Sequence, residues 1–595
     1  MRSLLTCFLL LLPCHTLAAA SENTSITVEN PIPVYYETVS PAARTKIGHR
    51  GLRLASVVKT KDQRFEAYCY DKGGQLSVWS SADNGLSWNQ VHTESAAVPE
   101  LDRPAEFNNV SASQPVDFLE ADEKDAHLLV LKDGRLLCTY ARQSLPNGTF
   151  AVISNDQGKT WGTEKPVYLA GSLPDSFGKP VSFELPDGTI LTAHSINLTS
   201  EANLTTYTKA SPDDPYNDSV VHAVRWRLPG DDGEAVEPAP NPVYPPALWA
   251  FTGSGQQIAY WEKLPTRRVR ILDHYKGAMG RLPDGTLLIT PLNRGTGTCD
   301  IYRSEDNGLT WNQVETQGVP LAGKEQSILC LPDNQTVLLT TQKNGTTLYR
   351  SPDGGVTWDT IDYGDKSLSY KRDLIRQSDG TIYMFNSVGH RQEHSGPNSV
   401  AWRVRSTDGG LTWGDRREVE SWSHRRPFFS EASVFAFSDT HFLKSSRING
   451  AHIEGITGVP KPGTNYEMIQ SNAFMESFDE GLTWSSPPKI PLDYSDVHAK
   501  VIKLTDGRLL CSYRNRSRLP FGVRAVFSED NGQTWDTNHR ILLGAHLNYY
   551  GGWQTDLQLP DGSMLTSWAW HFDGPTTFEV IHWELPSKVK SQRRR

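Results

Sequence analysis

SEDNGLTW, residues 304 to 311, holds a Ser, an Asp, a Gly and a Trp at fixed spacing. Six further stretches keep this spacing: SADNGLSW (81–88), SNDQGKTW (154–161), SPDGGVTW (351–358), STDGGLTW (406–413), SFDEGLTW (477–484) and SEDNGQTW (528–535). A catalytic group is needed once, so an element that occurs seven times is typical of a scaffold. In a tight turn an Asp carboxylate can accept backbone N–H bonds, Gly can adopt a positive φ, and Trp can pack beneath the turn. We therefore expect Asp306 and its six counterparts to be structural.

A second repeat runs in step with the first. An apolar strand, an Asp-Gly turn and another apolar strand precede most of the boxes, as in HLLVLKDGRLLCTYA around Asp133 and AKVIKLTDGRLLCSY around Asp506. Asp-Gly between two such runs is a strong signal for a β-hairpin. Weaker copies bring the total to nine units, and no long segment keeps the 3.6-residue apolar period of a helix. Two hairpins per unit make a four-stranded antiparallel blade, so the sequence predicts an all-β fold of the β-propeller type.

The pattern S-x-D-x-G-x-[TS]-W resembles the Asp-box, or BNR repeat, of the sialidase (neuraminidase) superfamily. At the level of repeats the resemblance covers nearly all of the chain after its first residues. It implies a propeller fold more strongly than an activity, because Asp-boxes also occur in other propeller glycosidases and in sortilin-type receptors.

Nine units are too many for the six-bladed ring that the resemblance implies. Units two and three resemble units eight and nine, and a Pro-rich stretch, EPAPNPVYPP, follows unit three at residues 237–246. We therefore expect N-terminal Asp-box units in residues 21–236, a linker at 237–246, a six-bladed sialidase-like propeller in 247–586 and a basic tail at 587–595. A single larger ring is the alternative.

The first 20 residues have the pattern of a signal peptide: Arg2, an apolar run and the small residues Ala18-Ala19-Ala20. Nine Asn-x-Ser/Thr sequons follow, which favours a secreted, extracellular glycoprotein. No later stretch has the roughly 20 apolar residues of a membrane-spanning helix. The net charge of −9 is spread without a basic stripe, which argues against nucleic acid as a partner. The oligomeric state is left open.

Five cysteines lie beyond the first 20 residues, at wide spacing. This spacing excludes a zinc ribbon and a dense disulfide scaffold. We expect one or two disulfides, with Cys299–Cys330 as the first candidate.

The resemblance also implies an active site, built from three Arg that hold a substrate carboxylate, a Tyr nucleophile activated by a Glu, and an Asp acid/base. Arg guanidinium groups grip a carboxylate through two parallel hydrogen bonds, and a neighbouring carboxylate can take the proton of a phenol. The segment FFSEASVFAFSDTHFLKSSR, residues 428 to 447, is the best match. It places Glu431 on the activating Glu and Arg447 on an Arg of the triad. A hairpin with its turn near Asp439 would bring both to one edge of a blade.

The remaining site residues match less closely. For the third Arg, Arg514 and Arg524 are preferred among the four Arg of SYRNRSRLPFGVR, and Tyr550 is the candidate nucleophile although Trp553 stands where sialidases usually place Tyr. Arg53 is the candidate for the first Arg. Asp373 is the candidate general acid.

Lys276 occupies the position of the first Arg in the six-unit set, and Lys is not equivalent to Arg at a bidentate carboxylate site. The pair His390 and His394 could bind a metal, but no third ligand is apparent, so we expect no metal and no cofactor. The sequence thus predicts a secreted exo-glycosidase that acts on terminal, in part acidic, sugars of glycans or polysaccharides. A propeller that binds glycans or proteins without catalysis is the alternative.

Overall fold

The computed structural model describes residues 26–27, 32–49, 51–71, 73–92, 119, 123–171, 178–197, 219–231, 233–237, 257–342, 346–363, 370–387, 402–419, 428–449, 470–485, 489, 491–492, 496–515, 520–546, 551–570 and 576–586. All regular structure within these ranges is β-strand, which confirms the predicted all-β class. In the described part of the chain no helix is long and apolar enough to cross a membrane.

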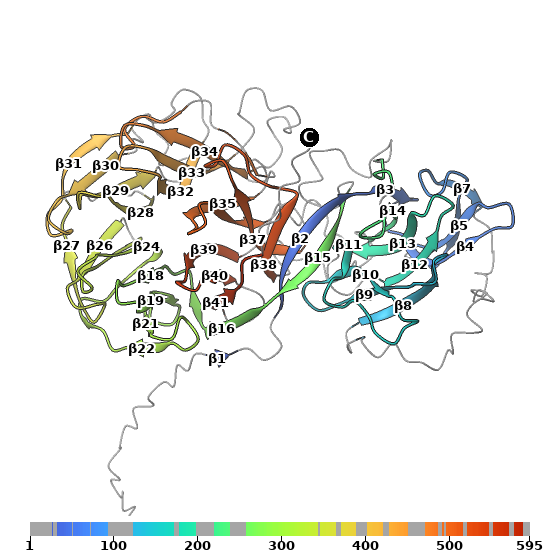
Figure 1. Cartoon of the computed structure of the whole chain (residues 1–595), viewed down its shortest axis with the longest axis horizontal. Helices are drawn as coiled ribbons and strands as arrows, with labels where there is room; N and C mark the ends of the chain where they lie inside the picture. Colours follow the sequence, from blue (N-terminus) through green and yellow to red (C-terminus); the bar gives the residue numbers. More distant parts are fainter. Residues whose placement is uncertain are drawn as a thin grey trace, which may run out of the picture.

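Six sheets form a ring, called the propeller below (Figure 1). Its first three sheets are built from β18 (Met279–Arg281), β19 (Leu287–Ile289), β21 (Ile301–Ser304) and β22 (Asn312–Val314); β23 (Gln317–Gly318), β24 (Lys324–Cys330), β25 (Val337–Gln342), β26 (Thr346–Ser351) and β27 (Thr357–Ile361); and β28 (Tyr370–Arg376), β29 (Ile382–Ser387), β30 (Trp402–Ser406) and β31 (Gly414–Glu418). The other three are built from β32 (Phe428–Ala436), β33 (Phe442–Asn449) and β34 (Gln470–Ser477); β35 (Val497–Lys503), β36 (Leu509–Asn515), β37 (Phe521–Ser528) and β38 (His539–His546); and β39 (Gly551–Gln558), β40 (Met564–Trp570), β41 (Thr577–Trp583), β16 (Thr266–Leu272) and β1 (Ile26–Thr27).

The ring closes in two ways. The inner strands β18, β24, β28, β32, β35 and β39 each pack against the next, and β39 packs against β18. In addition, β16 precedes the first sheet in sequence but pairs with β41 of the last, so the two ends of this part of the chain are hydrogen-bonded together. β17 (His274–Tyr275) and β20 (Leu292–Asn293) pair with each other in a small separate sheet. In the sequence, β17 precedes β18 and β20 follows β19.

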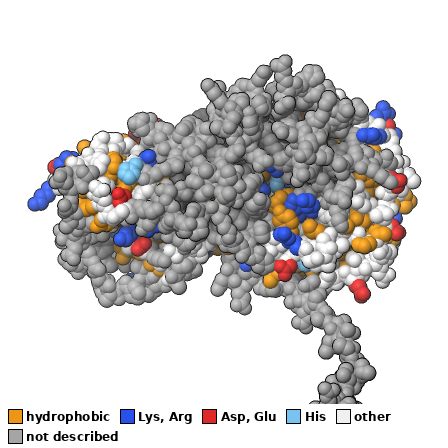
Figure 2. All heavy atoms as spheres, turned by 180° about the vertical axis from the view of Figure 1, so that it is seen from behind, with side chains coloured by type: hydrophobic (Ala, Val, Ile, Leu, Met, Phe, Trp, Pro, Cys, Tyr) orange, Lys and Arg blue, Asp and Glu red, His pale blue; other side chains and the backbone are white. Residues whose placement is uncertain are grey.

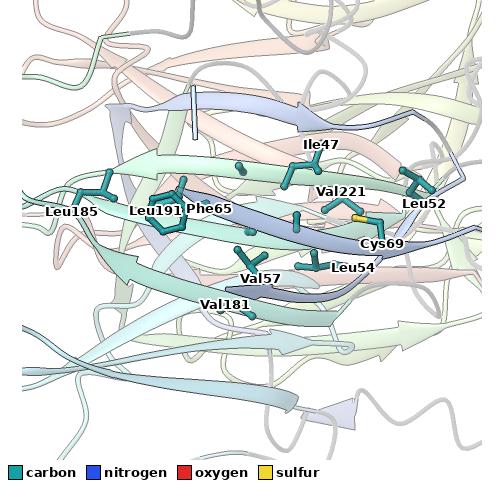
Figure 3. Close-up of a cluster of buried hydrophobic side chains, with 13 residues drawn as sticks. Ile47, Leu52, Leu54, Val57, Phe65, Cys69, Val181, Leu185, Leu191 and Val221 are labelled. Atoms are coloured by element: carbon teal, nitrogen blue, oxygen red, sulfur yellow. The ribbon is translucent and has the colours of Figure 1, made fainter. Parts of the chain in front are cut away.

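Three further sheets lie beside the ring and form the N-terminal lobe (Figure 1). Their strands are β4 (Arg53–Lys59), β5 (Phe65–Tyr70), β6 (Leu76–Ser81) and β7 (Asn89–His92); β8 (Glu123–Val130), β9 (Leu136–Arg142), β10 (Gly148–Ser154) and β11 (Val167–Gly171); and β12 (Gly178–Glu184), β13 (Ile190–Asn197), β14 (Ser219–Trp226) and β3 (Ala43–Ile47). The β12–β14 sheet packs on both of the others, and Figure 3 shows its apolar cluster with β4 and β5, which includes Leu54, Phe65, Val181 and Leu191. On the face seen in Figure 2, charged and hydrophobic side chains are interspersed over the described surface.

The two lobes exchange strands. β2 (Val34–Pro41) precedes the N-terminal lobe in sequence but pairs with β38 of the propeller, whereas β15 (Gln257–Leu264) precedes the propeller but pairs with β11 of the N-terminal lobe. β2 and β15 also pair with each other, so a single ten-stranded sheet runs through both lobes. The Pro-rich stretch predicted as a linker lies outside the described residues except for residue 237.

The exchange follows a local two-fold relation. Glu37 pairs with Trp261, 224 positions further on, and the same offset relates Pro41 to Pro265 and Arg44 to Arg268. Both Arg are fully buried and donate to a backbone carbonyl of the last strand of a neighbouring sheet, at Leu169 and Leu543. The chain therefore uses one edge-to-edge design twice.

The repeated boxes form the same turn wherever they occur. The Ser hydroxyl donates to the Asp carboxylate over 2.7–2.8 Å in all seven. In the box at 304–311 the carboxylate of Asp306 also accepts the backbone N–H of Leu309 and Thr310 and the hydroxyl of Thr310. Trp311 packs on Leu565 of the neighbouring sheet. These contacts give the Asp a structural role, as predicted.

The disulfide prediction is wrong. All five described cysteines are free thiols. Cys299 is buried and donates to the carbonyl of Gly323 over 3.2 Å, so its thiol already has a partner. The apolar surroundings of Cys330 raise the pKa of that thiol to about 12, which keeps it protonated and unreactive.

Candidate functional site

The rim of the propeller, defined as the edge where its inner strands begin, carries a row of β-bulges. Five inner strands shift register within their first residues, at Lys324/Ser327, Lys371/Asp373, Ser430/Ser433, Val497/Lys500 and Gly552/Thr555. Bulges redirect side chains and are common next to active sites. His498 and Trp553 lie in two of these bulges with φ values of 60° and 54°. The rim is therefore the irregular edge of an otherwise regular ring.

The segment that best matches the sialidase pattern reaches this rim. β32 and β33 form the predicted hairpin, in which Arg447 pairs with Ser430. Glu431 follows Ser430 inside the bulge, so its backbone lies beside that of Arg447. Arg447 is buried, with 8% of its side chain exposed. Opposite Arg447 on β34 is the fully buried Asn472, whose Oδ1 accepts the N–H of Ala499 over 3.1 Å and so ties this blade to the next.

Two cations flank an indole on the neighbouring part of the rim. The Lys276 Nζ lies 3.8 Å from the centre of the Trp553 ring, and the Arg514 guanidinium carbon lies 5.4 Å from it. Both cations are buried, at 6% and 4% exposure. Cation–π attraction is strongest with Trp and grows as the pair loses water. We call Lys276, Arg514 and Trp553 the cation–indole cluster.

Backbone geometry holds Arg514 in place. Arg514 is the next-to-last residue of β36 and pairs with Val497 at the bulge of β35. Its stem lies against Gly552, where an added Cβ would approach Arg514 Cδ to 2.9 Å. Gly552 also has a φ of 123°, a value that residues with a side chain rarely adopt.

Two further groups on the rim were missed by the sequence reasoning. Asp496 is fully buried directly before β35, and the ring of His498 lies 5.2 Å from that of Trp553. Neither Asp496 nor His498 belongs to an Asp-box or a hairpin turn, so the repeats offered no reason to select them. The Asp-x-His spacing in front of a strand would have been the only signal.

Arg524 has a different environment from the one predicted. Its Nε and Nη2 donate to the two oxygens of Glu37 over 2.7 and 3.2 Å, and its Nη1 donates to the carbonyl of Pro520. The ion pair is fully buried between the lobes, and Glu37 takes the bidentate face that a substrate carboxylate would need.

Asp373 is likewise engaged within the fold. Its Oδ2 accepts the backbone N–H of Val434 over 2.7 Å, which joins β28 to β32. The preceding pair of blades has a similar link, since Ser327 Oγ accepts the N–H of Leu374. The contact of Asp373 thus belongs to a series of inter-blade hydrogen bonds.

The remaining predicted residues are not brought to the rim by described contacts. Arg53 lies on β4 in the N-terminal lobe, whose sheet packs on β12–β14 and not on the last blade of the propeller. Tyr550, His390 and His394 lie outside the described residues. Among the residues that the structure describes, no group of three His, Cys, Asp or Glu could hold a metal ion.

Comparison with known proteins gives a partial match. No family model matches the chain. A curated relative described as a sialidase from Micromonospora viridifaciens is 29% identical over 196 residues, which make up 29% of this chain and 28% of the relative. The match therefore spans less than a third of that relative's length.

Three solved structures that share some likeness with this chain are described as sugar-acting proteins. An α-L-arabinofuranosidase from Fusarium graminearum is 14% identical, with a TM-score of 0.38, over 52% of this chain and 92% of that one. A Penicillium chrysogenum α-L-arabinanase is 15% identical, with a TM-score of 0.37, over 52% and 93%. A Trypanosoma rangeli sialidase is 11% identical, with a TM-score of 0.35, over 53% and 56%.

The predicted resemblance is thus confirmed by a direct sequence match: over part of its length, this chain is similar to a sialidase.

Proposed function

We propose that the protein is a secreted glycoside hydrolase that removes terminal acidic sugars from glycans or polysaccharides. The observation that carries this proposal is the cation–indole cluster beside the Glu431–Arg447 hairpin, because it combines carboxylate-binding cations, an aromatic surface and an acid on one rim. The similarity to a sialidase supports the same class of reaction.

Each rim residue has a role in this proposal. Arg447 and Arg514 bind the carboxylate of the sugar, and Lys276 adds a point charge without a bidentate fork. Trp553 offers a face for the apolar side of a sugar ring. Glu431 serves as the activating base, and Tyr550 remains the proposed nucleophile, so the reaction would retain the anomeric configuration. Secretion remains part of the proposal, on the signal-like first 20 residues.

A substrate panel tests the proposal. Purified protein is incubated with the 4-nitrophenyl or methylumbelliferyl glycosides of sialic acid, glucuronic acid, α-L-arabinofuranose and galactose. We expect turnover of at least one of the two acidic glycosides and a lower kcat/KM for the neutral ones. Turnover of the arabinofuranoside alone would contradict the acidic specificity.

A binding protein without catalysis is the second candidate. One observation favours it: Arg524 and Asp373, two of the predicted site residues, are engaged within the fold. Cleavage of no glycoside in the panel, together with calorimetric binding of free sialic or glucuronic acid, would establish this alternative.

A further inference from the structure

The exchanged strand β2, which lies between β38 of the propeller and β15, places a carboxylate beside β37 of the propeller. Glu37 is buried, with 3% of it exposed, and accepts hydrogen bonds from Arg524 of β37 and from Trp261 Nε1, the latter over 2.9 Å. Burial alone would raise the pKa of Glu37, but Arg524 and the other donors lower it, so the group is ionised. A buried ion pair with every oxygen satisfied holds its two strands in one fixed relation.

The ion pair continues to the rim. Arg524 Nη1 donates to the carbonyl of Pro520 over 3.0 Å, and the same carbonyl accepts Asn515 Nδ2 over 2.9 Å. Asn515 is fully buried and directly follows Arg514. Four groups therefore form a continuous chain from β2 to the end of β36.

The register of β36 and β37 links this chain to the cation–indole cluster. Tyr513 pairs with Arg524, and the next residue, Arg514, pairs with Val523. The pair that contains Arg524 is therefore directly next to the pair that contains Arg514. Arg514 has a stem packed on Gly552 and a guanidinium near Trp553, and its position depends on where this hairpin ends.

We propose that Glu37 is a positioning residue for Arg514 that acts through Arg524, Pro520 and Asn515. The exchanged strand β2 thereby contributes to sugar binding by the propeller without touching the sugar. The effect on binding rests on the proposed function, whereas the effect on the hairpin does not.

The test compares Glu37→Gln with a matched control, Glu164→Gln. Gln keeps the shape of Glu37 and its bond from Trp261 but removes the charge. Glu164 also forms an ion pair with an exchanged strand, through Lys263 of β15, but its side chain is 72% exposed. Two readouts are taken: hydrogen–deuterium exchange of residues 511–524, and kcat and KM for the glycosides of the panel.

For Glu37→Gln we expect amide exchange in residues 511–524 to quicken about tenfold, with a KM about tenfold higher for acidic glycosides and little change in kcat or in KM for neutral ones. Glu164→Gln should behave as wild type in both readouts. Unchanged exchange in Glu37→Gln overturns the proposal even for a protein that cleaves no glycoside. Faster exchange with an unchanged KM for an acidic substrate reduces Glu37 to a stabilising residue and also overturns it.

A second variant covers the case in which Glu37→Gln does not fold. Arg524→Lys keeps a positive charge opposite Glu37, but its single ammonium nitrogen replaces three separate nitrogens, so the bidentate contact with Glu37 and the separate bond to Pro520 are not both kept in the same geometry. It should raise KM for the acidic substrate in the same way. A wild-type KM and wild-type exchange in this variant would overturn the relay.

Discussion

Trp553 lies close to two cations at a position where the sialidase pattern has a Tyr, and it defines the site at the scale of single residues. The sequence marked Lys276 and Trp553 as departures from the family pattern, one at the start of the six units and one at their end. Ring closure brings the two departures together, so they form one feature. That could not be predicted, because no local pattern links residues so far apart in the chain.

Replacing Lys276 by Met tests this cluster. Met keeps the length and apolar stem of Lys but removes its charge, so we expect KM for an acidic glycoside to rise about tenfold, equivalent to 1.4 kcal/mol. KM for a neutral glycoside should stay within twofold. Equal losses for acidic and neutral substrates would show that Lys276 supports packing and does not contribute charge to binding.

Two of the sequons should carry no glycan. Asn515 is fully buried with its amide nitrogen bonded to Pro520, and Asn147 is buried with 1% exposure. A glycan is bulky and has no room in the folded core, so a chain that carries one at either residue would not reach this fold. Mass spectrometry of folded protein exported by a glycosylating host cell, after enzymatic deglycosylation, should find Asn515 and Asn147 unmodified. Occupancy at Asn515 would contradict the hydrogen-bond relay as well.

At the scale of elements, the Asp-box turn is the unit that the sequence predicts best. Its roles follow from the residue types: Asp as acceptor, Gly for a positive φ and Trp for packing. In the box at 304–311 these roles are all filled, and Gly308 has a φ of 84°.

Asp306→Ala should therefore lower stability and leave catalysis alone. The change removes the acceptor of four hydrogen bonds, so we expect the free energy of unfolding to fall by about 1–3 kcal/mol. Chemical denaturation measures this, and kcat at a temperature where the variant is folded should equal that of wild type. A large loss of kcat in folded Asp306→Ala would contradict the structural role.

The rim could be predicted only in part. The Glu431–Arg447 hairpin follows from two apolar runs around a turn, and the pairing of Ser430 with Arg447 agrees with it. The bulges could not be predicted, because each lies within the first residues of its strand, where too few residues precede it to show a break in the apolar alternation. The engagement of Asp373 and Arg524 depends on neighbouring blades and the other lobe, which the pattern within one unit does not contain.

At the scale of the whole molecule, units two and three were predicted to resemble units eight and nine, and the structure shows what they share. In both lobes a Trp of the last strand donates to a Thr of the preceding one: Trp226 to Thr192 over 2.9 Å and Trp583 to Thr566 over 3.0 Å. The exchange of β2 and β15 was not predicted, since it pairs strands that are more than 200 positions apart.

The two lobes differ in the side chains that surround their equivalent buried Arg residues, Arg44 and Arg268. Arg268 is paired with Glu579 over 2.6 Å, whereas the neighbourhood of Arg44 contains the buried rings of His222 and His194, 6.1 Å apart. Burial, and after it the charge of Arg44, lowers the pKa of His194 to about 3 and that of His222 well below its usual value. Lys46 adds a smaller effect of the same sign on His222.

The lowered pKa values predict acid lability of the N-terminal lobe. The unfolded chain binds protons at both His below about pH 6.5, whereas folded His194 does so only near pH 3 and folded His222 only well below pH 6.5, so stability is lost as pH falls below 6.5. Melting temperatures recorded between pH 7 and 4 should fall, and less steeply in His222→Glu, which supplies Arg44 with a carboxylate. A wild-type melting temperature independent of pH would contradict this explanation.

The central claim is that the rim of the propeller carries glycosidase chemistry with Glu431 as its base. The most direct measurement is kcat of Glu431→Gln on the acidic glycoside that wild type cleaves fastest, with Glu305→Gln, an exposed box residue, as control. We expect kcat to fall about 100-fold or more in Glu431→Gln at an unchanged melting temperature, and to equal that of wild type in the control. Wild-type kcat in folded Glu431→Gln would contradict it and leave the similarity to a sialidase as one of sequence and scaffold.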